Sequence, residues 1–161
     1  MNNQRRLAYW WAWLPVVALA AMAIHLGGVS IDGLRLNDPL DRVLARCGQP
    51  EKIEDLGMQA CCGYRMWEYR YAKKGLVLTI AQDEGQSRKY LLRVNVSAPA
   101  TAKTNLGIGI GSTRDQVKKA YGKPDVENPE SWTYRDSDCE GLIVGFQNDH
   151  VTSLFLGPFC E

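Results

Sequence analysis

Two stretches of this chain carry the same short pattern in the same order. Residues 37–50 and 111–124 share a Val, a Gly and a Pro at positions that differ by 74 in every case: Val43 and Val117, Gly48 and Gly122, Pro50 and Pro124. Each stretch is followed by a Trp-x-Tyr motif, at residues 67–69 and 132–134, and then by a Gly and an apolar segment. Such recurrence indicates two copies of one structural unit. It favours a repeated scaffold with a binding surface over a single catalytic centre.

Each copy is predicted to begin with a short helix. In residues 38–47, Asp38 can accept hydrogen bonds from the first free N–H groups, and an apolar stripe follows at helical spacing. In residues 112–121, Ser112 and Asp115 have the spacing of a capping box. The glycine and proline that both copies share then end each helix.

In the segments after each helix, apolar residues alternate with polar ones or form short runs, as is typical of strands. The predicted strands cover residues 65–72, 76–81, 90–96, 131–135, 142–146 and 151–156. Each unit is therefore predicted to be a helix followed by three strands. The expected fold class is α+β, with two tandem helix–three-strand repeats that form an antiparallel sheet covered by helices on one face. The expected boundaries are 1–30 for a leader and linker, 31–99 for the first repeat and 100–161 for the second, with short linkers at 27–36 and 99–103.

The N-terminal segment has the composition of an export signal. Arg5-Arg6 precedes an apolar run from Leu7 to Leu26 that contains no Asp, Glu, Lys or Arg. A run of this length can cross a bilayer as a signal-anchor helix, and the preceding arginines predict that the rest of the chain lies outside the cytoplasm. Ala21-Met22-Ala23 resembles a cleavage site, so a cleaved signal peptide is an equal alternative. Either way we expect a periplasmic domain, held at the inner membrane or released.

All five cysteines follow the apolar run, as expected for a chain in an oxidising compartment. If Asn148-Asp149 forms a two-residue turn, Cys139 and Cys160 lie almost opposite each other on the last hairpin, and we expect them to be joined. The other predicted bridge joins Cys47 to Cys61 or Cys62. An odd count leaves one thiol over.

The remaining composition argues against several classes of protein. Seventeen basic and 18 acidic residues follow residue 30, without a basic patch, so nucleic acid is not an expected partner. His150 is the one His beyond the apolar run, and it is expected in a surface turn. The acidic group Asp136, Asp138 and Glu140 lacks calcium-loop spacing, and the glycines of 107–111 lack the rest of a phosphate loop. We therefore expect no catalytic residues, no metal and no cofactor.

The aromatic residues of the two Trp-x-Tyr motifs allow two interpretations. Alternation places each group on one face of its strand, where the residues either bind a protein partner or pack beneath the helices. Because the tryptophans recur in both copies, core packing is favoured for them, and Tyr71 is the preferred contact residue. The candidate partner-binding residues are Trp67, Tyr69, Tyr71, Trp132 and Tyr134.

The pattern Gly-Ser/Thr-x-x-x-Val-x-x-x-x-Gly-x-Pro, followed by Trp-x-Tyr and a strand pair, resembles the SmpA/OmlA type of small envelope lipoproteins. Two tandem copies resemble the duplicated unit of β-lactamase inhibitory proteins. The resemblance covers residues 33–161, although Asn37 replaces the first Gly in the first copy and the lipid-bearing Cys is absent. It implies a binding module of the bacterial envelope.

Three functions follow from these observations. The leading expectation is a non-catalytic extracytoplasmic protein-interaction module that binds a protein partner of the envelope. A sharper alternative is an inhibitor or immunity-type protein that blocks an extracytoplasmic enzyme. A less favoured alternative is a thiol-based oxidoreductase that uses Cys61-Cys62, because Cys-x-x-Cys is missing.

Overall fold

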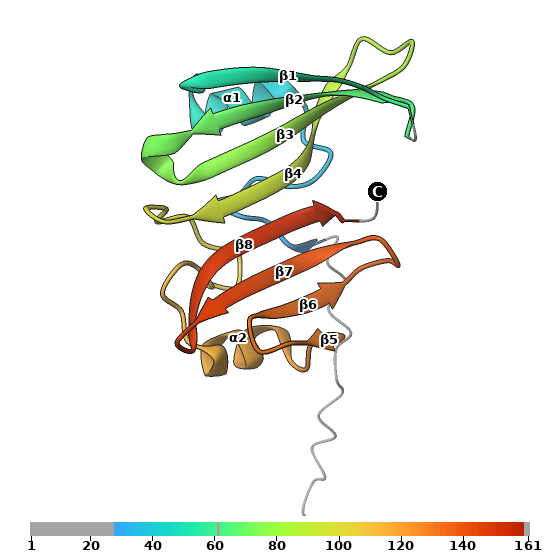
Figure 1. Cartoon of the computed structure of the whole chain (residues 1–161). Helices are drawn as coiled ribbons and strands as arrows, with labels where there is room; N and C mark the ends of the chain where they lie inside the picture. Colours follow the sequence, from blue (N-terminus) through green and yellow to red (C-terminus); the bar gives the residue numbers. More distant parts are fainter. Residues whose placement is uncertain (1–27, 61, 160–161) are drawn as a thin grey trace, which may run out of the picture.

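The protein forms one antiparallel sheet of eight strands, seen in a computed structural model that describes residues 28–60 and 62–159. The spatial order is β1-β2-β3-β4-β8-β7-β6-β5, so the last strands of the two halves meet in the middle (Figure 1). The elements are α1 (Leu40–Cys47), β1 (Lys52–Gln59), β2 (Tyr64–Tyr71), η2 (Ala72–Lys74), β3 (Leu76–Asp83), β4 (Lys89–Ser97), α2 (Arg114–Tyr121), β5 (Val126–Glu127), β6 (Ser131–Arg135), β7 (Glu140–Gln147) and β8 (His150–Pro158).

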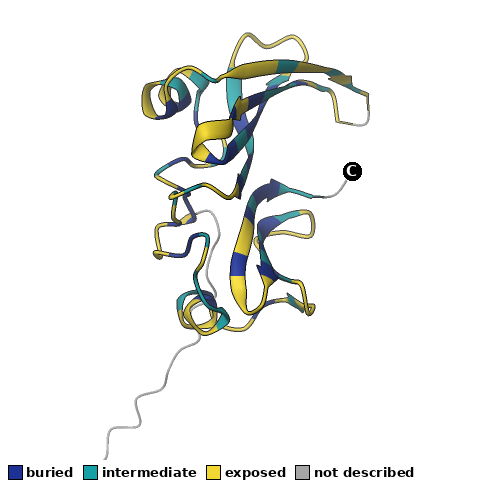
Figure 2. Ribbon diagram, turned by 60° about the vertical axis from the view of Figure 1, so that its left-hand side comes forward, coloured by how far each residue is buried: buried dark blue, intermediate teal, exposed yellow. Residues whose placement is uncertain are grey.

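Both α-helices lie on the same side of the sheet, one near each end (Figure 2). The middle of this side is covered by the irregular segments 28–38 and 98–113, which touch each other through a bridge between Ile31 and Thr104. Their apolar residues Val29, Ile31, Leu34 and Ile108 belong to the same core as the strands. The prediction that residues 27–36 are a linker is therefore wrong from Val29 onward.

The predicted fold class is also wrong, because the protein is mainly β-structure and its helices do not cover the sheet. Each α-helix has eight residues, which corresponds to about 12 Å of length. Eight strands about 4.8 Å apart span about 34 Å. Two short helices leave most of such a sheet to be covered by other segments.

Each repeat contains four strands rather than three. The two strands that the sequence does not predict are β1, which follows α1, and β5, which follows α2 and has only two residues. Lys52 of β1 pairs with Arg70, and Val126 of β5 pairs with Thr133. β1 lacks a continuous apolar face because it lies at the edge of the sheet, and β5 is too short to show a period.

The structure contains both copies of the repeat, but their strand residues align differently from what the two Trp-x-Tyr motifs predict. Tyr69 is opposite Leu78, as Trp132 is opposite Val144 in the second repeat. Trp132 therefore corresponds to Tyr69, and Tyr134 to Tyr71, so the two Trp-x-Tyr motifs are not equivalent. The interrupted register between Gly145 and Phe146 likewise repeats the one between Thr79 and Ile80.

Both helices start one or two residues later than predicted. The N-cap of α1 is Pro39, without a side-chain bond, while the buried carboxylate of Asp38 accepts from the N–H of Arg35 at 2.8 Å. The N-cap of α2 is Thr113, which forms a capping box with Gln116 in place of the predicted Ser112 and Asp115. The predicted C-terminal stops are confirmed, since a glycine with φ of 77° follows each helix.

The apolar run from Leu7 to Leu26 lies outside the described residues. Within residues 28–60 and 62–159, no helix has the length and apolar character needed to span a membrane.

Candidate interaction face

The aromatic residues proposed from the sequence as a contact platform lie on the covered side of the sheet. Tyr69, Tyr71, Trp132 and Tyr134 belong to the core cluster together with Val43 and Val117 of the helices. Tyr71 is only 2% exposed, so the prediction that it is an accessible contact residue is wrong. Burial raises its pKa to about 12. These four side chains pack in the core with residues of both helices. The core-packing interpretation is therefore confirmed for Trp132, and the three tyrosines are buried as well.

Trp67 differs from the other four because it is only partly buried. Two cations lie near its indole, with Nζ of Lys89 3.7 Å from the ring centroid and the Arg65 guanidinium 5.6 Å from it. Arg65 also forms an ion pair with Asp55 at 2.5 Å. The guanidinium lowers the pKa of that carboxyl through a hydrogen bond. Contacts within the first repeat therefore account for the position of Trp67.

The opposite side of the sheet is not covered by any helix or segment among the described residues (Figure 2). We call it the uncovered face, and it carries the strand residues that alternate with the core residues. One row of cross-strand neighbours on this face runs through all eight strands. It begins with the charged residues Lys52 of β1 and Arg70 of β2, and we call its other six residues the central row. The central row consists of Val77, Asn95, Phe155, Ile143, Thr133 and Val126.

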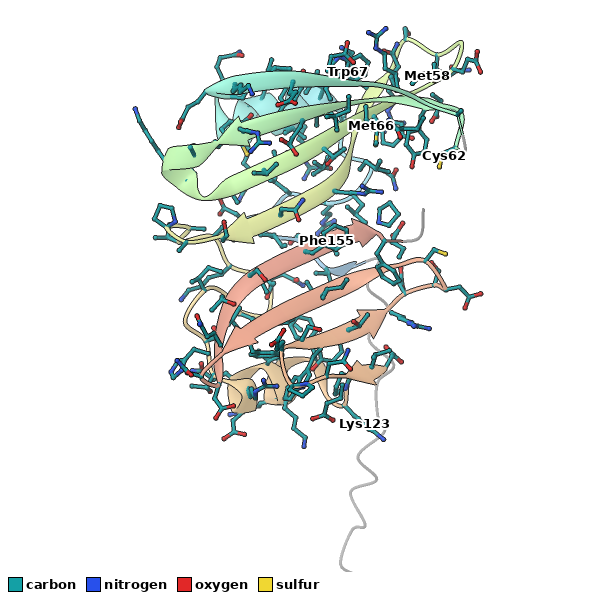
Figure 3. All side chains as sticks on the ribbon, viewed as in Figure 1. Met58, Cys62, Met66, Trp67, Lys123 and Phe155 are labelled. Carbon is teal, nitrogen blue, oxygen red and sulfur yellow. The ribbon has the colours of Figure 1, made fainter. Side chains whose placement is uncertain are left out.

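The central row is unusually apolar for a solvent-facing surface. Phe155 lies in its middle, on β8 beside the junction of the two repeats (Figure 3), and its direct neighbours are Asn95 and Ile143. All six residues of the row are half-buried. An antiparallel sheet with one face in water normally alternates apolar and polar residues. Here β7 contains Leu142-Ile143-Val144 and β8 contains Leu154-Phe155-Leu156, without a polar residue between the core positions.

Charged residues lie beside the apolar row in the first repeat. Glu68 and Arg93 are the partners of Thr79 on either side of it, so the three side chains share the uncovered face. Glu68 forms an ion pair with Arg70, which is the next residue of this face along β2. The apolar row thus borders a polar area, as is typical of protein interfaces.

A third row lies toward the hairpin end of the first repeat. Met66 and Ala81 are buried on the uncovered face, and Ala81 is paired with Tyr90. The Tyr90 hydroxyl donates to Asp83 Oδ1 at 2.7 Å. Burial, with this carboxylate, raises the pKa of Tyr90 to about 12. These residues extend the uncovered face away from the junction.

The cysteines are arranged differently from the sequence prediction in the first repeat. Cys47 is a buried free thiol at the end of α1, so the predicted bridge from Cys47 is wrong. Cys62 is exposed in the hairpin turn at the far end of β1 (Figure 3). A strand of eight residues, about 26 Å long, therefore separates the two. Cys61 lies outside the described residues.

Cys139 is disulfide-bonded. The Asn148-Asp149 turn forms as predicted, with both residues at positive φ. The register interruption after Gly145 then places Glu140 opposite Pro158. The N–H of Phe159 donates to the carbonyl of Cys139 at 2.8 Å. The backbone of Cys139 is thus hydrogen-bonded to Phe159, the residue before Cys160. A Cys139–Cys160 disulfide stays our prediction.

His150 and the acidic residues singled out from the sequence lie in bends and at strand ends. His150 is exposed at the start of β8, and its Nδ1 lies 2.8 Å from the carbonyl oxygen of Asn148. In residues 28–60 and 62–159, no three His, Cys, Asp or Glu side chains are grouped as metal ligands. Asp136 and Glu140 are joined through their backbones.

Comparison with family models, curated proteins and solved structures finds no match to this chain. The uncovered face remains the candidate interaction surface among the described residues. Sequence reasoning missed this face, although the unbroken apolar triplets around Ile143 and Phe155 were a signal for it. Such triplets are typical of strands that are buried on both faces.

Proposed function

We propose that this protein is a non-catalytic protein-binding module of the extracytoplasmic space, and that a protein partner covers the uncovered face of its sheet. The observation that carries the proposal is the central row, in which Phe155, Ile143 and Val77 are half-buried on a face that no helix or segment of the described residues covers. Contiguous apolar surface of this kind marks interaction sites in soluble proteins.

The position of the row at the junction of the repeats supports a broad contact. β4 and β8 pair directly from Val94 to Ser97, so both repeats present one continuous surface. A row across six strands about 4.8 Å apart is roughly 24 Å long, which suits the surface of a folded partner. The inhibitor-type alternative is one form of this function, in which the bound partner is an enzyme.

The extracytoplasmic location rests on two features. Arg5-Arg6 before the apolar run has the order expected of an export segment. Cys139 is disulfide-bonded, and structural disulfides persist mainly outside the reducing cytoplasm. The resemblance to envelope lipoprotein units agrees with the same location.

The test is site-specific photo-crosslinking in the producing cell. A photoreactive phenylalanine analogue replaces Phe155 or Ile143 in the full chain, and the control position is Lys119, which is exposed on α2. We expect one protein adduct from the two sheet positions and none from the control. The same adduct from all three positions, or no adduct from Phe155 and Ile143, would contradict the proposal.

Affinity measurement then separates contact from folding. Phe155→Ser should weaken binding of the captured partner by at least about 30-fold, which corresponds to the roughly 2 kcal/mol of an interface hot spot. Lys119→Ala is the matched control and should bind normally. Unfolding midpoints of both variants show whether the sheet is intact. Full affinity in a folded Phe155→Ser variant would remove the central row from the interface.

A further inference from the structure

Among residues 28–60 and 62–159, strand β1 has no neighbour on its outer side, and it carries exposed apolar side chains. It is the outermost strand of the sheet, whereas the strand at the other edge, β5, has only two residues (Figure 1). Among the described residues, three of the four exposed large hydrophobic side chains belong to β1: Ile53 (51% exposed), Leu56 (41%) and Met58 (52%). Long, apolar edge strands invite pairing with another strand, and proteins normally protect them.

The second repeat shows that the fold does not require an apolar residue at this edge. Ile53 is opposite Tyr69, and its counterpart Glu127 is opposite Trp132. Glu127 is exposed and charged in the same structural position. On the helices, Leu44 likewise corresponds to Lys118 by the offset of 74 residues. The apolar edge is thus a property of the first repeat and not of the repeated unit.

The backbone of Ile53 points away from the sheet. The carbonyl of Arg70 accepts from the N–H of Glu51 at 2.9 Å, so the backbone of Arg70 faces β1. In an antiparallel strand successive residues face opposite neighbours. Tyr69 therefore faces β3, and its partner Ile53 directs its N–H and C=O groups to the free edge. By the same alternation Asp55 also faces outward.

We propose that β1 of one molecule pairs antiparallel with β1 of a second copy, centred on Ile53 against Ile53. In such a pairing, each residue whose backbone faces outward lies opposite an outward-facing residue of the other copy. Three close registers satisfy this condition, and they are centred on Lys52, Ile53 and Glu54. Centring on Lys52 opposes two lysines, and centring on Glu54 opposes two glutamates. Lys52 and Glu54 already form an ion pair within each chain, with 3.0 Å between Nζ and Oε2. Centring on Ile53 places Lys52 of each copy opposite Glu54 of the other, so the two ion pairs join into a group of four charges in which opposite charges face each other across the contact.

The neighbouring residues fit the same register. It brings Glu51 opposite Asp55 of the other copy, but both carboxylates are already occupied. Asp55 is paired with Arg65, and Glu51 accepts from the N–H of Lys73 at 3.1 Å. The register interruption between Asp55 and Gly57, where Asp55 Oδ1 accepts from the N–H of Gly57 at 2.9 Å, ends the pairing. The contact is therefore short and confined to residues 51–55.

The geometry of this pairing has a consequence for the whole molecule. Antiparallel pairing of identical strands requires a two-fold axis, which lies perpendicular to the sheet when one continuous sheet is formed. Both uncovered faces then point in the same direction. A dimer would present two copies of the central row to one partner surface.

A charge-exchange experiment tests the register in the purified full chain. Lys52→Glu places two glutamates opposite Glu54 residues, and Glu54→Lys places lysines opposite Lys52. Each variant alone should be monomeric by sedimentation, whereas an equimolar mixture should dimerise because every facing pair is again of opposite charge. The Lys52→Glu/Glu54→Lys double variant should dimerise by itself. Wild-type chain that sediments as a monomer at the highest soluble concentration would overturn the proposal.

The Ile53→Glu variant separates edge pairing from other contacts. It introduces the residue that the second repeat carries at this position, so folding should be retained and dimerisation lost. Circular dichroism and unfolding midpoints check the fold. If association instead depends on the apolar N-terminal run, wild type, both single variants and Ile53→Glu will all associate alike, and the proposal is contradicted.

Discussion

The hydroxyl of Tyr71 donates a hydrogen bond to the carbonyl of Gly48, with 3.1 Å between the oxygens. Gly48 is the residue that ends α1, and Tyr71 is the last residue of β2. The second repeat makes the same bond, since the hydroxyl of Tyr134 lies 3.3 Å from the carbonyl oxygen of Gly122. Each helix end is thus attached to its sheet by a buried tyrosine, and this bond defines the repeat more sharply than the Trp-x-Tyr motif.

Tyr71→Phe and Tyr134→Phe should each lower the free energy of unfolding by about 0.5–1.5 kcal/mol, the usual net value of one hydrogen bond. The ring stays in place, so the loss reports the bond to the helix end. Urea unfolding of both variants measures it. A loss confined to one repeat would show that the two bonds are not equivalent.

Stability should also fall in alkali because these tyrosines are buried. Burial raises the pKa of Tyr71 from 10 to about 12, and it raises the pKa of Tyr134 as well. A raised pKa in the folded state means that the neutral form is favoured there. The contribution to stability is therefore complete below about pH 10 and is lost as the pH rises toward 12. Urea midpoints across this range measure it, and Tyr71→Phe should flatten the decline.

The sequence was sufficient to predict the helices, their stops and six of the eight strands, because these depend on local signals such as glycine and apolar periodicity. It was insufficient for the alignment of the aromatic residues. Trp67, Tyr69 and Tyr71 alternate on one strand face, so shifting the match by two residues gives an equally good pattern. Only the cross-strand partners Leu76 and Leu78 decide which tyrosine holds the helix.

The glycines that end the helices should not tolerate a side chain. Gly48 has φ 77° and ψ −166°, and Gly122 has φ 77° and ψ −149°. This region is essentially restricted to glycine. No atom lies within 4 Å of a Cβ built at either position, so backbone strain alone sets the cost. Gly48→Ala and Gly122→Ala should each destabilise by about 1–3 kcal/mol in denaturant unfolding, while Gln49→Ala should have little effect.

The uncovered face could not be predicted from the sequence, for a different physical reason. A side chain such as Phe155 lies between core residues Leu154 and Leu156, and an apolar triplet does not reveal which face is covered. That depends on how far the helices and the segments 28–38 and 98–113 extend over the sheet. The exposure of Tyr71 was mispredicted for the same reason. Its place near a strand end suggested an exposed side chain, but α1 covers it.

Asn37 is the position where the first repeat departs from the shared pattern, and its backbone explains what is needed there. Asn37 has φ 66°, and Gly111, its counterpart, has φ 84°. Both donate their N–H groups to the last strand of their repeat, to the carbonyls of Leu91 and Val151, at 2.8 Å in each case. Asn adopts positive φ more readily than other residues that carry a Cβ.

Asn37→Gly should therefore leave the free energy of unfolding unchanged or raise it slightly. Asn37→Ala and Gly111→Ala should each lower it by about 1–2 kcal/mol, because an ordinary L-residue is strained at this φ. Denaturant unfolding of the three variants provides the measurement. Since the carbonyl of Asn37 accepts from Arg88 Nη2 at 2.8 Å, Arg88→Ala serves as the control for that contact. Equal stability of Asn37→Ala and Asn37→Gly would show that positive φ is not the constraint that selects Asn at this position.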